Sequence, residues 1–367
     1  MSKPAVALAR TQPSPELAPA EAPVTTQFRD FTQPWLDLND KSVLVTGGTG
    51  SFGKHFLKTV IQRYKPRRII IYSRDELKQS DMQLDFPASQ YPFLRFFIGD
   101  VRDRDRLDLA LRDVDYVVHA AALKQVPAAE YNPFECIRTN VFGAENIVYA
   151  ALRRNVKKVL ALSTDKAANP VNLYGASKLA SDKIFVAANN LAGADGTKFA
   201  VVRYGNVFGS RGSVVPFFRK LIADGAESLP ITDPRMTRFW ITLTQGVNFV
   251  LSSMEMMRGG EIYVPKIPST TITDLARLIS PKMEQKIVGI RPGEKLHETM
   301  IPADDSHWTV DLNDRFIILA SFAQAAREAY LARGAVPVPE GFSYSSDTNP
   351  EALDVRGLQT LLQMSYA

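Results

Sequence analysis

Three glycines at a spacing of three residues follow the first apolar run of the chain, residues 42–45, and precede a helical pattern over 54–63. Glycines at such points let the turn close tightly, let backbone amides approach a pyrophosphate, and let the helix pack on the strand. The amino end of the helix then faces the anion. Between a strand and a helix, this triplet predicts a dinucleotide cofactor site. The residues of the turn that we expect to contact the cofactor are Gly47, Thr49, Gly50, Ser51, Phe52 and Gly53.

Short apolar runs alternate with helical patterns from Lys41 to about Arg203. Such runs, often β-branched and separated by amphipathic stretches, are typical of a parallel sheet that helices cover on both faces. The sequence therefore predicts an α/β fold with a doubly wound parallel sheet of the Rossmann type. After Tyr204 shorter elements predict a smaller C-terminal substrate-binding lobe. The predicted strands are residues 42–45, 68–72, 95–98, 115–118, 159–162 and 199–202, and the later helices are 216–223, 244–256 and 273–279.

The chain divides into four predicted parts. Residues 1–39 are rich in proline and alanine and have little hydrophobic periodicity, which predicts a disordered arm. The end of this arm, residues 28–38, is apolar enough to dock on a neighbour. Residues 40–203 are the predicted cofactor domain with the catalytic residues, and 204–320 are the substrate lobe, mixed with the first domain. Residues 321–367 are a C-terminal extension to which the sequence assigns no role.

Composition limits the function classes. With 367 residues, 45% of them hydrophobic, the chain is long enough for one large core and a second, smaller one. The formal charge of +5 is not gathered into a basic stripe, which argues against nucleic-acid binding. The single cysteine, Cys136, excludes a disulfide within the chain, and since His297 and His307 are isolated we expect no metal. No apolar run reaches the roughly 18 residues of a membrane span, so we expect a cytoplasmic protein.

The end of the second predicted strand bears on which cofactor is bound. An NAD-specific enzyme usually places an acidic residue there, on the ribose hydroxyls. In this chain Ser73, Arg74 and Lys78 could instead hold a 2′-phosphate, so the sequence favours NADP, although Asp75 stands nearby. The further expected cofactor contacts are Asp100 and Val101, beside the adenine, and Ala120, beside the pyrophosphate.

Tyr174 and Lys178 form a Tyr-x-x-x-Lys pattern, which on a helix places both side chains on one face. A cation there lowers the phenol pKa and holds the nicotinamide ribose, so that the tyrosine can take a hydroxyl proton while hydride leaves the same carbon. The spacing alone is that of an ordinary helix pair, but it follows a strand and accompanies the glycine turn. We expect Thr164, at the end of that strand, to hydrogen-bond the substrate oxygen.

The pattern of motifs resembles the extended short-chain dehydrogenase/reductase family over residues 41 to about 318. The stretches Ser-Thr-Asp-Lys-Ala-Ala-Asn-Pro at 163–170 and Asn-Leu-Tyr-Gly-Ala-Ser-Lys at 172–178 are similar to the inverting UDP-N-acetylglucosamine 4,6-dehydratases. Those enzymes make the first intermediate towards pseudaminic acid, which is used to glycosylate flagellin. One departure is Gln125, where many relatives carry histidine. Further similar stretches are 121–127, 130–133, 203–207 and 291–295.

The resemblance implies a dehydration with inversion at C5 of the sugar. Tyr174 acts as base while NADP accepts hydride from C4, and the resulting ketone acidifies the C5 proton. Lys166, with a pKa lowered by burial next to Lys178 and the cofactor, removes that proton. Asp165, when protonated, gives a proton to the departing C6 hydroxyl, and hydride returns to C6. Retaining relatives carry Asp-Glu at the matching pair, so Lys166 favours inversion.

The resemblance also implies a UDP-sugar as the partner in the second half of the chain. Arg291 would neutralise the diphosphate and Glu294 would hold the ribose. Asn206, after the strand that ends at residue 202, would meet the sugar or its phosphate. Relatives form homo-oligomers, so we expect at least a dimer. The expected substrate contacts are Lys124, Asn206, Thr232, Arg238, Arg291 and Glu294.

Two other functions remain open at this point. A UDP-hexose epimerase would share the cofactor site with Thr164, Tyr174 and Lys178, but it would not need an acid and a base at Asp165 and Lys166. A non-catalytic NADP-binding regulator of the same fold would have no reason to keep the Tyr-x-x-x-Lys and Asp-Lys pairs.

Overall fold

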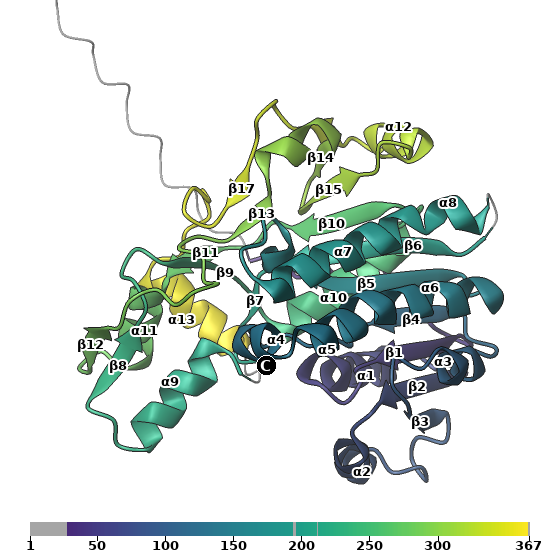
Figure 1. Ribbon diagram of the computed structural model, residues 1–367, viewed down its shortest axis with the longest axis horizontal. Coiled ribbons are helices and arrows are strands. Elements are labelled where there is room, and N and C mark those ends of the chain that lie inside the picture. The colour runs from purple at the N-terminus through teal and green to yellow at the C-terminus, as the bar shows by residue number, and fades with distance from the viewer. Residues whose placement is uncertain (1–27, 194–195, 211, 366–367) are drawn as a thin grey trace, which may run out of the picture.

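A ten-stranded sheet forms the centre of the protein, shown as a computed structural model in Figure 1, which describes residues 28–193, 196–210 and 212–365. All six predicted strands are present and pair in parallel, which confirms the predicted α/β sheet. Across the sheet the strands lie in the order β16 (Val336–Pro337), β14 (Thr309–Leu312), β15 (Arg315–Leu319), β10 (Glu261–Pro265), β6 (Lys198–Tyr204), β5 (Lys158–Thr164), β4 (Tyr116–His119), β1 (Ser42–Thr46), β2 (Arg68–Ser73) and β3 (Leu94–Ile98).

The strand order reverses beside β1, and this fixes where a ligand can bind. From β1 the chain runs outward through β2 to β3, and β4 then returns to the other side of β1. In an open parallel sheet, the loops that leave the carboxyl ends of two such strands diverge and leave a crevice between them. The turn at 47–50 and the segment after His119 are these two loops, so the predicted cofactor residues lie at the crevice.

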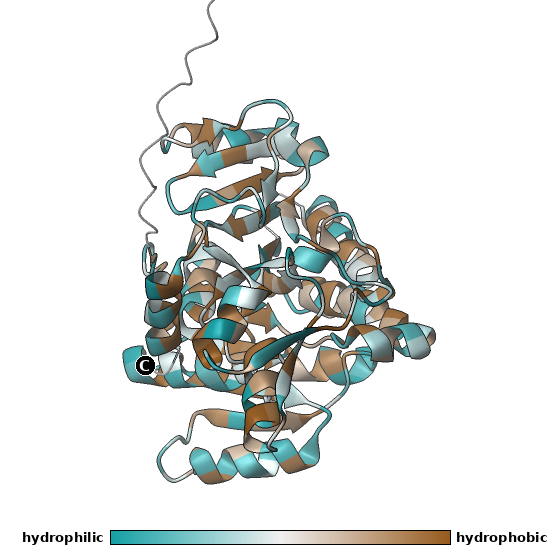
Figure 2. Ribbon diagram, turned by 90° about the vertical axis from the view of Figure 1, so that its left-hand side faces the viewer, coloured by the Kyte–Doolittle hydropathy of each residue, from teal (hydrophilic) through white to brown (hydrophobic). Residues whose placement is uncertain are grey.

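Helices cover both faces of the sheet. In Figure 1, α6 and α7 lie in front of β5 and β6, while α1 and α10 pack together on the other side. The helices in Figure 2 carry brown and teal stretches by turns, as expected of elements that present one apolar face inward. Their bounds are α1 Ser51–Arg63, α2 Glu76–Asp85, α3 Arg104–Ala110, α4 Val126–Tyr131, α5 Pro133–Ile137, the π-helix Arg138–Phe142, α6 Gly143–Arg153, α7 Leu173–Ala187, α8 Asn189–Ala192, α9 Val214–Ala223, α10 Leu243–Met256, α11 Ile272–Ile279, α12 Gln324–Leu331 and α13 Val355–Met364, with short 3-10 helices at Asp165–Ala167 and Ala303–Trp308.

A second hydrophobic cluster forms the core of the smaller lobe. It joins Phe218 of α9, Leu275 of α11 and Leu358 of α13 around the buried Trp240. The last helix of the C-terminal extension, α13, is therefore part of this lobe, whereas β16 of the same extension belongs to the large sheet. Strands β10, β14 and β15, from within 204–320, also belong to the large sheet. The short strands are β7 (Asn206–Val207), β8 (Ser228–Ile231), β9 (Thr237–Ile241), β11 (Ser269–Thr271), β12 (Glu284–Ile287), β13 (Thr299–Ile301) and β17 (Tyr344–Ser345).

The prediction of a disordered arm over residues 1–39 is wrong for its last part. Phe31, Leu36 and Leu38 are buried in the main core. The Phe31 ring packs edge-on against Phe249 of α10, with the ring centroids 5.1 Å apart. Composition underestimated this segment because its few apolar side chains find a preformed surface within the same chain. Residues 1–27 lie outside the described residues.

Polar side chains of α10 hold the backbone of this segment. Gln245 donates to the carbonyl of Arg29 at 2.7 Å, and Ser252 donates to the carbonyl of Gln33 at 2.9 Å. The Arg29 guanidinium in turn makes two 2.7 Å hydrogen bonds to the Glu351 carboxylate. Residues 28–39 thus connect α10 to the C-terminal extension.

Replacing Phe31 with alanine should lower the free energy of unfolding by about 3 kcal/mol, because a buried ring is lost and a cavity is left behind. Chemical denaturation of the full chain measures this change. The exposed Phe322 provides a matched control, and Phe322→Ala should change the same quantity by less than about 0.5 kcal/mol. Equal effects of the two substitutions would contradict the packing described for residues 28–39.

Within the described residues, no helix combines the length and apolar character needed to cross a membrane.

Candidate active site

The glycine turn makes a close-fitting cradle. Gly47 has a φ of +65°, and a Cβ atom at this position would lie 2.9 Å from the backbone of Ala121. A Cβ atom on Gly53 would lie 2.2 Å from the carbonyl oxygen of Gly48, so only glycine lets α1 approach the turn. Gly50 is the N-cap of α1 and has no side chain with which to cap it. The first amides of α1 therefore suit an anionic group, and the turn fits the pyrophosphate of a nicotinamide dinucleotide.

The residues predicted to read the cofactor's adenosine end gather where β2 and β3 end. The Thr49 and Ser73 hydroxyls lie 2.9 Å apart. The Arg74 guanidinium lies 3.3 Å from the Asp100 carboxylate, and the Lys78 amine forms an ion pair with Asp75. The Asp75 carboxylate also caps α2 by accepting a hydrogen bond from the Lys78 amide at 3.0 Å. Asp75 thus has a structural role here as the cap of α2. Arg74, Lys78 and the Ser73 hydroxyl are the groups at this edge that we expect to contact a 2′-phosphate.

The other predicted cofactor residues line the same edge. Burial raises the pKa of Asp100, but its hydrogen bonds from Arg102 and the nearby Arg74 charge outweigh this and hold the pKa below its usual value. Val101 is buried, and the amide of Ala120 donates to the carbonyl of Thr46 at 3.2 Å. Val101 and Ala120 therefore contribute apolar wall and backbone rather than charge.

Tyr174 lies in the first turn of α7, whose N-cap Asn172 accepts a hydrogen bond from the Gly175 amide at 2.8 Å. The Tyr174 side chain is 9% exposed, and its phenol is a hydrogen-bond partner of the Thr164 hydroxyl. Burial raises the pKa of Tyr174 to about 12, although the nearby Lys166 charge acts to lower it. The expectation that a cation lowers the phenol pKa is therefore wrong, because burial outweighs the effect of the Lys166 charge.

Lys178 lies one turn further along α7 and is buried. Burial lowers the pKa of its amine, and the buried Asp182 carboxylate opposes this shift. Asp182 is itself held by the Ser163 hydroxyl at 2.8 Å and by Arg203 at 3.3 Å. Lys178 thus sits on the predicted face of the helix, next to a fixed negative charge.

Asp165 and Lys166 open a 3-10 helix directly after β5, and the side chain of Thr164 caps that helix. Asp165 is 0% exposed. Its Oδ1 atom accepts hydrogen bonds from the Thr164 hydroxyl at 2.8 Å and from the Lys166 amine at 3.1 Å. Among the residues that the structure describes, its Oδ2 atom has no hydrogen-bond partner. The pair can therefore exchange a proton across one contact while one carboxylate oxygen is left for a substrate.

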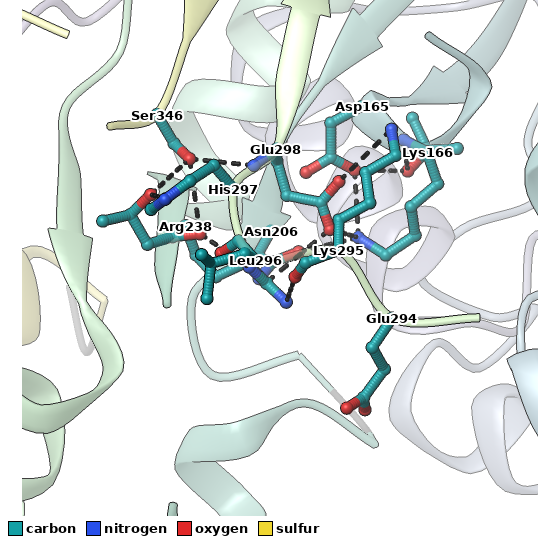
Figure 3. A network of polar contacts seen from close by, with 12 residues as sticks. Asp165, Lys166, Asn206, Arg238, Glu294, Lys295, Leu296, His297, Glu298 and Ser346 are labelled. Atoms are coloured by element: carbon teal, nitrogen blue, oxygen red, sulfur yellow. Dashed lines mark hydrogen bonds and ion pairs between the residues drawn. The ribbon is translucent and has the colours of Figure 1, made fainter. Parts of the chain in front are cut away.

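The sequence analysis missed Glu298, whose Oε1 atom lies 3.1 Å from the Lys166 amine (Figure 3). Glu298 is 2% exposed, and it directly precedes β13, whose Met300 and Ile301 pack in the main core. The predicted contact Asn206 also reaches Lys166, with its side-chain oxygen 3.5 Å from the amine. The one sequence signal for Glu298 was its place three residues after the motif at 291–295. Glu298 and Lys166 are far apart in the chain, so nothing else in the sequence indicates that they are in contact.

Glu298 changes the expected protonation of Lys166. Burial lowers the pKa of the Lys166 amine, but the Asp165 and Glu298 carboxylates more than offset this, so that the pKa lies above its usual value. The expectation that burial next to Lys178 would lower this pKa is therefore wrong, because two buried carboxylates face the amine. In the resting site Lys166 is an ammonium.

Arg238 holds the segment that carries Glu298. It is 8% exposed, and its guanidinium donates to the carbonyls of Leu296 at 3.1 Å and Lys295 at 3.0 Å. Its Nε atom lies 3.6 Å from the Glu298 carboxylate. These contacts direct much of the Arg238 guanidinium towards the backbone of residues 295–296 and the Glu298 carboxylate, so they support a positioning role, and its contact with a substrate stays a prediction.

The remaining predicted substrate residues lie around this network. Arg291 and Glu294 form an ion pair of 2.7 Å in a turn, and Glu294 points away from the Lys166 cluster in Figure 3. The carbonyl of Gly293 in that turn accepts a 2.7 Å hydrogen bond from Asn172, which ties the turn to the start of α7. Thr232 follows β8, and the exposed Lys124 precedes α4. Their contacts with a substrate stay predictions.

The described part of the chain contains no group of three or more histidine, cysteine, aspartate or glutamate residues placed to hold a metal ion.

Comparison with known proteins places this site in a family. Residues 43–320 match the model of the polysaccharide biosynthesis protein family. The chain belongs to this family. A protein of Campylobacter jejuni described as UDP-N-acetylglucosamine 4,6-dehydratase (inverting) is 60% identical over 85% of this chain and 94% of its own length. A UDP-glucose 4-epimerase of Rickettsia canadensis is 42% identical over 88% of this chain and 95% of its own length. The predicted resemblance to the inverting dehydratases is thereby confirmed.

Solved structures of similar proteins share the fold. Pen from Bacillus thuringiensis superposes with a TM-score of 0.82 at 35% identity, covering 90% of this chain and 99% of that chain. A double mutant of DesIV, a dTDP-glucose 4,6-dehydratase from Streptomyces venezuelae with NAD bound, superposes with a TM-score of 0.60 at 26% identity, covering 69% of this chain and 86% of that chain. A relative of the same fold thus binds a nicotinamide dinucleotide.

Proposed function

We propose that this protein removes water from UDP-N-acetylglucosamine with inversion at C5, giving UDP-2-acetamido-2,6-dideoxy-β-L-arabino-hex-4-ulose. The observation that carries the proposal is the Asp165–Lys166 pair, with its Oδ1 and Nζ atoms 3.1 Å apart and close to Tyr174. Elimination needs an acid and a base in one place, because the C5 proton must leave and the C6 hydroxyl must be protonated. The 60% identity to the Campylobacter jejuni dehydratase supports the same reaction.

The reaction begins at C4. Tyr174 takes the proton of the C4 hydroxyl, and Thr164, its hydrogen-bond partner, holds the same oxygen. NADP, when bound in the glycine cradle, supplies hydride transfer from C4 and later back to C6. Lys178, on the same helix face as Tyr174, holds the ribose of the cofactor. The C4 ketone then makes the neighbouring C5 proton acidic enough for a lysine amine to remove.

Asp165 and Lys166 carry out the elimination. In the resting site Lys166 is protonated, whereas the elimination needs a neutral amine and a protonated Asp165 carboxyl. One proton that moves from Nζ to Oδ1 converts the first arrangement into the second without exchange with water. Lys166 then takes the C5 proton, and Asp165 protonates the departing C6 hydroxyl. A new proton that reaches C5 from the opposite face inverts that centre.

In this proposal, residues of the second half of the chain bind the diphosphate and the ribose of the substrate. Arg291 is 71% exposed on its side chain and can turn from Glu294 towards a diphosphate. Asn206 lies beside Lys166 and can hydrogen-bond the sugar. We assign Lys124 and Thr232 to the rim of the same site. The product is the chemical precursor of pseudaminic acid, so we extend the proposal to that pathway and to flagellin glycosylation. We further propose that the protein works as a homo-oligomer.

We propose NADP rather than NAD as the cofactor, because Arg74 and Lys78 stand at the end of β2, where a 2′-phosphate would lie. Arg74→Ala should weaken NADP binding about 10-fold or more, while NAD binding changes little, since only the phosphate loses a charged hydrogen bond. Titration calorimetry with each cofactor measures this difference. Arg95→Ala, on β3 and away from the cradle, is the control. Equal losses for NAD and NADP would argue against a 2′-phosphate site.

Proton NMR of the purified protein with UDP-N-acetylglucosamine in heavy water tests the proposed function. A new C6 methyl signal with deuterium at C5 and the couplings of an L-arabino sugar is the expected result. A D-xylo product would retain the dehydratase class but remove the argument for inversion from Lys166. An unchanged sugar would leave the non-catalytic NADP-binding regulator as the better reading.

A UDP-hexose epimerase is the second candidate, because the Rickettsia canadensis relative at 42% identity is described as a UDP-glucose 4-epimerase. Such an enzyme needs Thr164, Tyr174 and Lys178 but has no use for a proton relay at C5. In the same NMR experiment it would give UDP-N-acetylgalactosamine with C6 and C5–H intact.

A further inference from the structure

We propose that Glu298 is a positioning residue that holds the Lys166 amine against Asp165, and that the C-terminal extension fixes Glu298 through Ser346. The proposal rests on the proposed function for its effect on catalysis, but its structural part can be tested without it. It also gives a role to the C-terminal extension, to which the sequence assigned none.

The contact between Glu298 and Lys166 is buried and specific. Glu298 Oε1 lies 3.1 Å from Lys166 Nζ, the same distance as Asp165 Oδ1, so the amine is held between two carboxylates. Since Glu298 is 2% exposed, water does not screen this charge as it would at the surface. An uncompensated carboxylate would be costly at such a depth, and Arg238 and Lys295 supply the balancing charge at 3.6 and 3.9 Å.

The backbone of Glu298 is fixed by the C-terminal extension. The Ser346 amide donates to the Glu298 carbonyl at 2.8 Å, and the Glu298 amide donates to the Ser346 hydroxyl at 2.9 Å. The same hydroxyl lies 2.7 Å from that of Thr237 on β9. Strand β17 pairs with β13 directly beside these bonds. Glu298 is therefore clamped on both backbone sides by a segment that contributes no group of its own to the chemistry.

Glu298 fixes both the place and the charge of Lys166. A lysine side chain has a flexible four-carbon stem. Without a second carboxylate partner the amine would therefore spend part of the time away from the position in which it can take the C5 proton. The neighbouring negative charge of Glu298 also favours the protonated form of Lys166. The charged and titratable groups that face the Lys166 amine or its ion-pair partners are Asp165, Tyr174, Arg238, Lys295 and Glu298.

Two substitutions separate place from charge. Glu298→Gln keeps the length and removes the charge, so the pKa of Lys166 should fall. The limb of the pH profile of kcat that reports the Lys166 amine should then move to lower pH, with kcat at the new optimum within a few-fold of wild type. Glu298→Ala removes the contact as well and should lower kcat by about 10- to 100-fold with KM nearly unchanged, as expected for the loss of a charged hydrogen bond.

A second readout does not depend on turnover. Lys166 is 25% exposed on its side chain, so we choose a small acylating reagent as the probe of its amine, and mass spectrometry can follow that site in the full chain. Only the neutral amine reacts, so at a fixed alkaline pH Lys166 should react faster in Glu298→Gln than in wild type, on the order of tenfold. Ser346→Ala should shift the rate in the same direction by a smaller factor.

Matched controls come from the same elements. Ser343→Ala removes an exposed hydroxyl that donates to the Ile301 carbonyl on the same C-terminal segment, and it should leave both readouts unchanged. Glu261→Gln removes another buried carboxylate, one bound by Tyr330 away from the site, and controls for a loss of fold stability.

The outcomes distinguish the two proposals. An unaltered acylation rate and pH profile in Glu298→Gln would overturn the inference, whether or not the wild-type protein dehydrates its sugar. A wild-type protein that leaves UDP-N-acetylglucosamine unchanged, with Lys166 still more reactive in Glu298→Gln, would overturn the proposed function and keep the role of Glu298. If Glu298→Ala fails to fold, the Glu298→Gln measurements still decide.

Discussion

Lys166→Met should lower the rate of product formation by about 10³-fold or more, because it removes the base that takes the C5 proton while keeping a side chain of similar length. Oxidation at C4 should continue, since Tyr174 does not need Lys166 in order to accept the hydroxyl proton. It should be slower than in wild type, because loss of the Lys166 charge raises the pKa of Tyr174 further. A stopped-flow record of reduced-cofactor absorbance, combined with NMR of the C5 position, measures the two steps separately.

The expected pattern for Lys166→Met is reduced cofactor that accumulates without deuterium at C5 and without a C6 methyl group. Lys158→Met is the matched control, because Lys158 lies at the opposite end of β5 and donates to the Met254 carbonyl. It should leave both steps within a few-fold of wild type. Deuterium at C5 in Lys166→Met at the wild-type rate would show that another group is the base and would remove the structural argument for inversion.

Tyr174→Phe should lower the rate of cofactor reduction by about 10³-fold, since no other group would take the C4 hydroxyl proton. Every later step depends on the C4 ketone, so product formation should fall by the same factor. Lys166→Met, by contrast, should retain cofactor reduction. Anaerobic single-turnover absorbance of the reduced cofactor is the measurement.

The pH dependence of the same step adds a second signature. Because burial raises the pKa of Tyr174 to about 12, the phenol is protonated at neutral pH, and proton loss limits the fraction of active enzyme. The rate of cofactor reduction in wild type should therefore rise with pH below that value, and Tyr174→Phe should lose the rise. Tyr263→Phe, which removes a buried hydroxyl bound to Tyr330 on the large sheet, should keep it. A Tyr174→Phe enzyme with the wild-type pH profile would contradict the role of this phenol.

Features that depend on local sequence could be predicted before the fold was known. The six predicted parallel strands followed from short apolar runs, since a strand buried on both faces is mostly apolar along its length. The glycine cradle followed from local geometry, since a Cβ on Gly53 would strike the Gly48 carbonyl whatever the rest of the chain did. Adjacent residues such as Asp165 and Lys166 share a site by connectivity alone.

Contacts between residues far apart in the chain could not be predicted from the sequence in this way. The residues 28–39 look disordered by composition, yet Phe31 finds Phe249 on a helix formed by residues far downstream. Arg238 is an expected substrate contact, and the fold places its guanidinium against the carbonyls of residues 295 and 296, which lie far along the chain. A pattern that judges a residue by its neighbours in sequence cannot show either contact.

The sequence by itself determined the six predicted parallel strands, the cofactor cradle, the helix that carries Tyr174 and Lys178, and the Asp165–Lys166 pair, because each depends on neighbours within a few residues. Only the tertiary structure decided the protonation of Lys166. Burial lowers the pKa of its amine and the Asp165 and Glu298 carboxylates raise it, and Glu298 reaches the amine only through the folding of a distant part of the chain, which leaves no local trace in the sequence.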